Sequence, residues 1–202
     1  MSAPKNALQA TDASPLRLEL FSDAVMAVIV AVMVLTLKVP PDTTPRALLA
    51  AWPVFLGYAA GYVMVAVYWM SHHHLFRMVR RADMRVLCAN MLFLFAVSLI
   101  PFATAYMGEM RFAKFPAMVY AVVLLFCAAA QLVLICAVFR HVEKTQDSAA
   151  LRKTMVMKSV TAMAICAASV PLALYWPGIA LTMAVVLGGF YVMPSTRIEK
   201  RS

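Results

Sequence analysis

The feature that most constrains this chain is a series of five long segments without a charged residue. They cover residues 24–37, 47–70, 86–108, 115–139 and 159–196. A helix needs about 20 apolar residues to cross the hydrocarbon core of a bilayer. Apolar residues make up 64% of the chain and charged residues 13%, which is more apolar than one soluble domain can bury. The sequence therefore predicts an all-α integral membrane protein whose main partner is the lipid bilayer.

The last segment is long enough for two crossings. It contains Tyr175, Trp176, Pro177 and Gly178 in succession. Proline and glycine favour a turn, and tyrosine and tryptophan favour the membrane interface. Dividing the segment here predicts six transmembrane helices in a domain of residues 17–194.

The basic residues predict that both termini lie on one side of the membrane. Six crossings place the N-terminal arm, residues 1–16, and the tail, residues 195–202, on the same face. Fourteen of the 18 lysine and arginine residues fall on that face, which the positive-inside rule assigns to the cytoplasm. They are Lys5, Arg17, Arg77, Arg80, Arg81, Arg85, Arg140, Lys144, Arg152, Lys153, Lys158, Arg197, Lys200 and Arg201. We therefore expect cytoplasmic termini and a location in the inner (plasma) membrane.

The sequence contains no recognisable catalytic or cofactor motif. It has no GxSxG, HExxH or P-loop lysine motif, and Asp23 is the only acid inside a predicted span. Cys88, Cys127, Cys136 and Cys166 stand singly in apolar segments, without metal-ligand spacing. Because the basic residues lie between apolar runs, they do not form a nucleic-acid patch. We expect no enzyme activity, cofactor, bound metal or nucleic-acid partner, and interpret the cysteines as reduced packing residues.

Polar side chains stand at the start of the first predicted helix, in the stretch RLELFSD. Ionisable groups at membrane depth are costly, so they usually face a protein interior or a water path. Arg17 and Asp23 lie about 240° apart around a helix and about 9 Å apart along it, so they cannot pair with each other. Each therefore needs a partner from another helix. The candidates at the same depth are Trp69, His72, His73, His74 and Asn90.

These residues allow three interpretations. The first is an ionic and hydrogen-bonded clasp at the inner mouth that responds to pH, because a histidine near an aspartate stays charged more readily. The second is a polar cap on a helix end at the membrane interface. The third is haem ligation, which adjacent histidines suit poorly because bis-histidine haem needs ligands on facing helices.

The first helix carries a bulky apolar stripe beside a line of small residues. The stripe consists of Phe21, Val25, Val28, Val32 and Leu35, and the small residues are Ala24, Ala27 and Ala31. This spacing is typical of a seam between helices. The stripe either lines a narrow pore around a shared axis, where aliphatic rings can gate by dewetting, or packs inside one six-helix bundle. Periodicity does not distinguish the two.

Three motifs resemble one family of channels. They are Arg17-x-x-x-Phe21-Ser22-Asp23, the WxxHH of Trp69, His72 and His73, and the string from Asn90 to Thr104 that contains Leu92, Phe93, Ser98, Ile100, Pro101 and Phe102. Together they are similar to the transmembrane protein 175 family of potassium channels, in its bacterial six-helix form. The resemblance implies a homotetramer whose pore is lined by the first helix of each subunit and lacks a TVGYG filter.

The resemblance also assigns roles to residues of the first helix. It implies a narrowest hydrophobic ring at Val28, with further rings at Val32 and Leu35. It implies that Arg17, Ser22 and Asp23 form a cytoplasmic network with Trp69, His72 or His73, and Asn90. Several members of the family carry a hydroxyl residue at the position of Ala31, and some carry another at the position of Ala27. We therefore expect permeant monovalent cations with a weak preference for potassium over sodium.

Two other functions remain open on the sequence alone. One is a secondary transporter or proton pathway that uses Asp23 and the cluster His72–His74. A lone acid at one mouth favours passive permeation over this alternative, because proton relays string several ionisable groups along the path. The other is a small membrane scaffold in which the polar clasp is purely structural.

Overall fold

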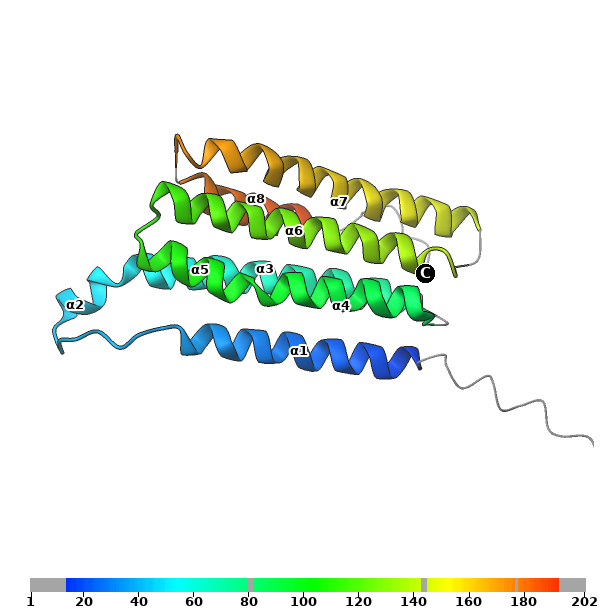
Figure 1. The fold of residues 1–202 in the computed structure, drawn as a ribbon, viewed down its shortest axis with the longest axis horizontal. Helices are drawn as coiled ribbons and strands as arrows, with labels where there is room; N and C mark the ends of the chain where they lie inside the picture. The colour runs from blue at the N-terminus through cyan, green and yellow to red at the C-terminus, as the bar shows by residue number, and fades with distance from the viewer. Residues whose placement is uncertain (1–13, 80–81, 143–144, 177, 193–202) are drawn as a thin grey trace, which may run out of the picture.

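The structure is a computed structural model that describes residues 14–79, 82–142, 145–176 and 178–192. The described helices are α1 (Pro15–Leu35), α2 (Pro45–Ala50), α3 (Trp52–Phe76), α4 (Met84–Ser98), α5 (Ile100–Glu109), α6 (Lys114–Val138), α7 (Gln146–Leu172) and α8 (Ile179–Val192). Successive long helices run in opposite directions through one bundle (Figure 1).

Five of the described helical segments are long and apolar enough to cross a membrane: α1, α3, the pair α4–α5, α6 and α7. Helix α8 is described over 14 residues, which is about 21 Å at 1.5 Å per residue. The residues after Val192 lie outside the described part of the chain. The all-α, multi-pass architecture is thus confirmed, and a sixth crossing stays a prediction. The predicted arm and tail lie almost entirely outside the described residues.

Two of the charge-free segments are each divided between two helices. Helix α4 ends at Ser98 and α5 begins at Ile100, so Pro101 is in a first turn, where its missing N–H breaks no helical hydrogen bond. Helix α7 ends at Leu172 and α8 begins at Ile179. This confirms that the long last segment divides.

The short helix α2 interrupts the segment expected to form a single span over 47–70. Thr44 caps α2, because its hydroxyl accepts a hydrogen bond from the Ala47 N–H at 3.3 Å. The next helix starts afresh at Trp52 with Pro53 in its first turn. Two prolines therefore open two separate helices where hydropathy alone indicates one.

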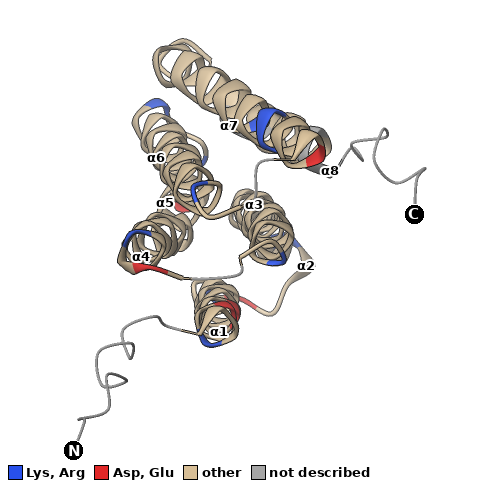
Figure 2. Cartoon of the chain, turned by 90° about the vertical axis from the view of Figure 1, so that its right-hand side faces the viewer, with Lys and Arg blue, Asp and Glu red and all other residues tan. Residues whose placement is uncertain are grey.

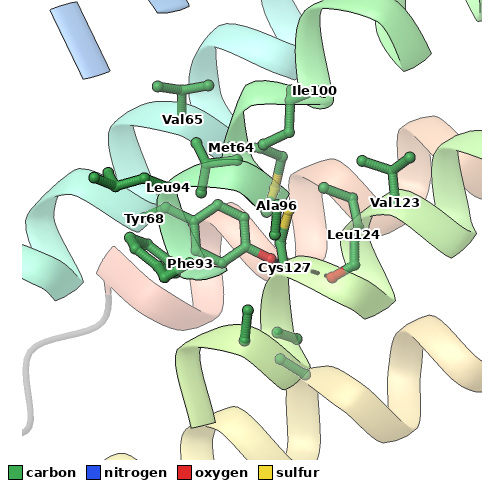
Figure 3. Packing of buried hydrophobic residues seen from close by; sticks show 14 of the residues in the cluster. Met64, Val65, Tyr68, Phe93, Leu94, Ala96, Ile100, Val123, Leu124 and Cys127 are labelled. Carbon is green, nitrogen blue, oxygen red and sulfur yellow. Dashed lines mark hydrogen bonds between the residues drawn. The ribbon is translucent and has the colours of Figure 1, made fainter. Parts of the chain in front are cut away.

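The apolar core lies between α3, α4, α5 and α6 (Figure 3). Tyr68 on α3 is fully buried there, and its hydroxyl donates a hydrogen bond to the carbonyl oxygen of Leu124 at 3.4 Å. Its ring meets that of Phe93 edge-on, with centroids 6.0 Å apart. The hydroxyl group of the buried Tyr68 thus has a hydrogen-bond acceptor inside an otherwise apolar layer. All four cysteines are free. Cys127 and Cys166 are buried, as expected of packing residues, whereas Cys88 is exposed and Cys136 is half-buried.

Helix α1 lies at the edge of the bundle, with α7 and α8 on the far side (Figure 2). It packs against α3, α4 and α5. Its contact residues recur at helical spacing and are Leu18, Ser22, Met26, Ile29 and Met33. The other residues of α1 are exposed or partly buried.

One end of the bundle is rich in basic residues. The start of α1, the ends of α3 and α6, and the starts of α4 and α7 lie together there, at the right of Figure 1, and this end faces the viewer in Figure 2. The described basic residues at this end are Arg17, Arg77, Arg85, Arg140, Arg152 and Lys153. We call it the basic end. The helix directions therefore bring together the basic segments that the sequence analysis assigns to one face.

Candidate functional site

A chain of hydrogen bonds ties α1 to α4 and α3 near the basic end. Asn90 on α4 is fully buried, and its amide nitrogen donates to the hydroxyl of Ser22 on α1 at 2.8 Å. The Ser22 hydroxyl in turn donates to the Leu18 carbonyl oxygen at 2.8 Å. On the other side, the Asn90 carbonyl oxygen lies 2.9 Å from Nε2 of His72 on α3. One asparagine thus joins three helices.

His72 is enclosed between aromatic rings. It stacks on Phe76, with centroids 4.1 Å apart, and on Phe93, with centroids 5.6 Å apart. Because the Asn90 oxygen can only accept, Nε2 carries the proton of this hydrogen bond. The second ring nitrogen, Nδ1, is buried without a partner among the described residues. This arrangement fixes the plane of the His72 ring, and the hydrogen bond to Asn90 fixes the position of Nε2.

Asp23 is held by a second bond between α1 and α3. The indole Nε1–H of Trp69 donates to its carboxylate at 2.9 Å. The Trp69 ring stacks on His73, with centroids 5.6 Å apart. His73 in turn pairs with Glu19 on α1, with Nδ1 and Oε1 3.3 Å apart. Side chains therefore attach the first three turns of α1 to α3 at two positions, Glu19 and Asp23.

The structure brings together most of the predicted inner-mouth residues. The residues that join the cluster are Ser22, Asp23, Trp69, His72, His73 and Asn90, and we call this cluster, with Glu19, the polar clasp. Arg17 makes no hydrogen bond or ion pair with a described residue and is exposed at the basic end, and Phe21 is also exposed. His74 is exposed too.

Two contacts near the polar clasp were missed by the sequence reasoning. Glu19 lies one turn before Asp23, on the side of α1 that meets α3, and this spacing was the available signal. Gln131 on α6 donates to the hydroxyl of Ser71 on α3, which extends polar bonding to a fourth helix. A mid-span glutamine is the kind of residue that usually bonds to a neighbouring helix.

Most of the bulky stripe on α1 faces away from its own subunit. The exposed fractions are 50% for Phe21, 60% for Val28, 43% for Val32 and 80% for Leu35. Val25 is partly buried against the core. These four exposed residues therefore do not form a packing seam inside one bundle, which was one of the two interpretations of the pattern.

The small flank of α1 borders α3. A groove of about 230 Å³ lies between the two helices, and Asp23, Ala27, Tyr62 and Trp69 are among its lining residues. Ala31 is exposed one turn further along. Asp23 is thus the charged residue of this groove, and the remainder of its wall is almost entirely apolar.

Clusters of three potential metal ligands are absent from the described residues. Within them, no group of three histidine, cysteine, aspartate or glutamate side chains is placed to hold a metal ion. His72 uses Nε2 for Asn90, and its neighbours His73 and His74 are exposed on the same helix. Facing histidines of the kind that ligate haem are therefore not formed by this cluster.

These features define a multi-pass, all-α membrane protein whose half-exposed first helix is fixed at one end by a polar clasp. Residues 17–101 match the model of the family described as endosomal/lysosomal potassium channel TMEM175. A potassium channel of Chryseobacterium sp. (strain P1-3) is 33% identical over 185 residues, which cover 91% of this chain and 95% of that protein. The chain belongs to the TMEM175 family.

Two solved structures share the fold. The crystal structure of a lysosomal potassium-selective channel TMEM175 homolog from Chamaesiphon minutus is 28% identical, covers 88% of this chain and 98% of its own, and gives a TM-score of 0.69. A threonine-to-alanine variant of the potassium channel MtTMEM175, bound to a Nanobody-MBP fusion protein, gives a TM-score of 0.61 at 17% identity, which shows likeness of fold alone. The family and these relatives are potassium channels, not enzymes.

Proposed function

We propose that this protein is a potassium-permeable cation channel that conducts passively through a central pore lined by α1 from each of four subunits. The observation that carries the proposal is the exposed stripe of bulky side chains on a helix that packs against its own subunit on one side only. The relatives are potassium channels, which supports this use of the exposed face. A pore lined by one helix per subunit requires symmetric copies of the chain.

Val28, Val32 and Leu35 form the proposed constriction. They lie on one face of α1, at successive turns. In a symmetric assembly each becomes a ring of branched aliphatic side chains, and such rings can exclude water when the pore is narrow. The proposed barrier to ions is therefore dehydration in an apolar passage.

The proposed channel discriminates weakly between potassium and sodium. Ala27 and Ala31 carry no hydroxyl that could contact a hydrated ion beside the rings. Selectivity between the two ions would then depend on pore diameter alone. We place the basic end in the cytoplasm and the channel in the inner (plasma) membrane, because positively charged loops are retained on that side.

The polar clasp supports a channel more than a proton-coupled transporter. Asp23 accepts a hydrogen bond from Trp69, and His72 is bonded to Asn90 between two aromatic rings. Both groups thus serve to hold α1 in place. Beyond Asp23, α1 carries no ionisable residue that could pass a proton onward.

Potassium flux in proteoliposomes tests this function. Val32→Asn makes one proposed ring polar, and Val34→Asn makes the same change two residues further along, about 200° around the helix. We expect Val32→Asn to raise potassium flux at least several-fold and Val34→Asn to leave it near the wild-type level. Equal effects of the two variants would contradict a pore lined by the stripe. Saturable flux that requires a proton gradient and is lost in Asp23→Asn would support the transporter instead.

A further inference from the structure

The side of the bundle formed by α4 and α6 carries a groove that the proposed pore does not use. Its volume is about 600 Å³. Its lining residues include Arg85, Cys88 and Leu92 on α4 and Val133, Cys136 and Arg140 on or just after α6. A groove of this size on the surface of a membrane-spanning bundle can hold acyl chains, because those chains are the solvent at this depth.

The register of the two helices separates the groove into a charged mouth and an apolar floor. Residues 85, 88 and 92 are spaced by three and four along α4, so they lie on one face. Residues 133, 136 and 140 are spaced in the same way along α6, which runs in the opposite direction. Arg85 and Arg140 therefore both lie at the end of the groove nearest the basic end, and the apolar floor extends about 10 Å from them along the helices.

The two arginines at the mouth are available to an anion. Both side chains are exposed, and neither forms an ion pair with a described residue. Asp83, two residues before Arg85, accepts a hydrogen bond from the backbone N–H of Val86 at 2.9 Å and pairs with His141 at 3.1 Å. It also attracts Arg85 electrostatically, without forming an ion pair with it. A guanidinium group can donate two parallel hydrogen bonds to a phosphate, so a groove lined by two arginines suits that anion.

We propose that this groove binds an anionic phospholipid, with its phosphate between Arg85 and Arg140 and an acyl chain along Leu92, Val133 and Cys136. Basic pockets between transmembrane helices bind anionic headgroups in this way. A second copy of the chain fits the groove less well, because an apolar contact between subunits would bury two unpaired arginines. The site lies on a different face of the subunit from the α1 stripe, so it is independent of the proposed function.

Native mass spectrometry of the full chain, with phosphatidylglycerol and phosphatidylcholine offered together, tests the proposal. We expect wild-type protein to retain phosphatidylglycerol preferentially. Each basic residue near an anionic surface contributes about fivefold in affinity, so R85Q/R140Q should weaken phosphatidylglycerol retention by about 25-fold. The matched control is R152Q/K153Q, which removes the same charge from the same end on α7 and should retain most of the preference. Equal loss in both double variants would overturn a defined site.

Thiol labelling gives a readout that needs no variant. Cys127 and Cys166 are buried, whereas Cys88 is exposed and Cys136 is half-buried in the wall of the groove. Phosphatidylglycerol should slow maleimide labelling of Cys136 several-fold relative to phosphatidylcholine. Inorganic phosphate should not, because it has no acyl chain to cover the thiol. Protection by inorganic phosphate, or equal labelling in both lipids, would overturn the proposal.

Discussion

Asn90 is the residue on which the position of α1 depends most. Its side chain is hydrogen-bonded to Ser22 on α1 and to His72 on α3, and its exposed fraction is 0%. The sequence predicted that these residue types would meet at one membrane depth, because helix length and direction determine depth. It could not predict which pairs form, since that depends on the rotation of each helix about its own axis.

Replacing Asn90 with alanine removes both bonds at once. We expect a loss of about 1–3 kcal/mol of stability, since hydrogen bonds between membrane helices contribute about 0.6 kcal/mol on average and up to about 1.7 kcal/mol each, with a further cost for buried partners left unpaired. Thermal unfolding in detergent would measure the loss. The control is Ser98→Ala on α4, an exposed hydroxyl bonded only to the Phe95 carbonyl of its own helix. We expect that variant to unfold within about 0.5 kcal/mol of the wild type.

At the scale of elements, α3 and α5 approach through glycines. A Cβ on Gly57 would lie 2.9 Å from the carbonyl oxygen of Thr104, and a Cβ on Gly108 would lie 2.9 Å from Cα of Val54. Small residues of this kind allow two helix backbones to pack closely in a membrane. The helices themselves were predictable from charge-free runs, but this contact was not, because a glycine in a span does not reveal what it faces.

Gly57→Ala should force the two helices apart, since the obstructing atom belongs to the backbone. We expect a cost of about 1–3 kcal/mol from overpacking, partly offset by alanine's better helix propensity of up to about 1 kcal/mol. In α8, a Cβ on Gly189 would meet nothing within 4 Å. Gly189→Ala is therefore the matched control and should be neutral or stabilising. A comparable loss of thermal stability in both variants would argue against close packing of α3 on α5.

Helix α4 begins at a titratable cap. The backbone N–H of Val86, and then His141, hold the pKa of Asp83 below its ordinary value. A carboxyl whose pKa is lower in the folded than in the unfolded state stabilises the fold above its unfolded pKa of about 3.9. That contribution is lost as the pH falls through the lower, folded pKa.

Acid should therefore destabilise the wild type more than an uncharged variant. Asp83→Asn removes the titration but keeps a side chain that can cap a helix. We expect the difference in melting temperature between wild type and Asp83→Asn to shrink as the pH is lowered from 6 to 3. Parallel melting curves across that range would show that the cap carries no ionic contribution.

For the whole molecule, the position of α1 at the edge of the bundle favours the association of several subunits through that helix. The sequence could not decide between an internal seam and a pore wall, because the same spacing serves both. The subunit excludes the internal seam for the exposed stripe, and the shared axis remains our proposal.

Cross-linking between subunits tests that axis. In a background of Cys88→Ser and Cys136→Ser, Val28→Cys should form disulfide-linked dimers of the 22.2 kDa chain on mild oxidation, because copies of this position converge at the proposed constriction. Val160→Cys is the control, an exposed residue on α7, on the far side of the bundle from α1. A cross-link that forms equally at both positions, or at neither, would contradict a pore lined by α1.

The polar clasp also has a mechanical consequence. The side-chain hydrogen bonds and ion pairs between α1 and other described helices involve Glu19, Ser22 and Asp23. The polar attachments of α1 therefore lie near the basic end, and Met26, Ile29 and Met33 hold the rest of the helix by apolar packing. Val28 is about 9 Å from Ser22 along the axis, and Leu35 is about 20 Å away. A tilt of α1 about the polar clasp would therefore move Leu35 roughly twice as far as Val28. In the proposed pore, the diameter of the Leu35 ring would then vary about twice as much as that of the Val28 ring, which lies nearer the polar clasp.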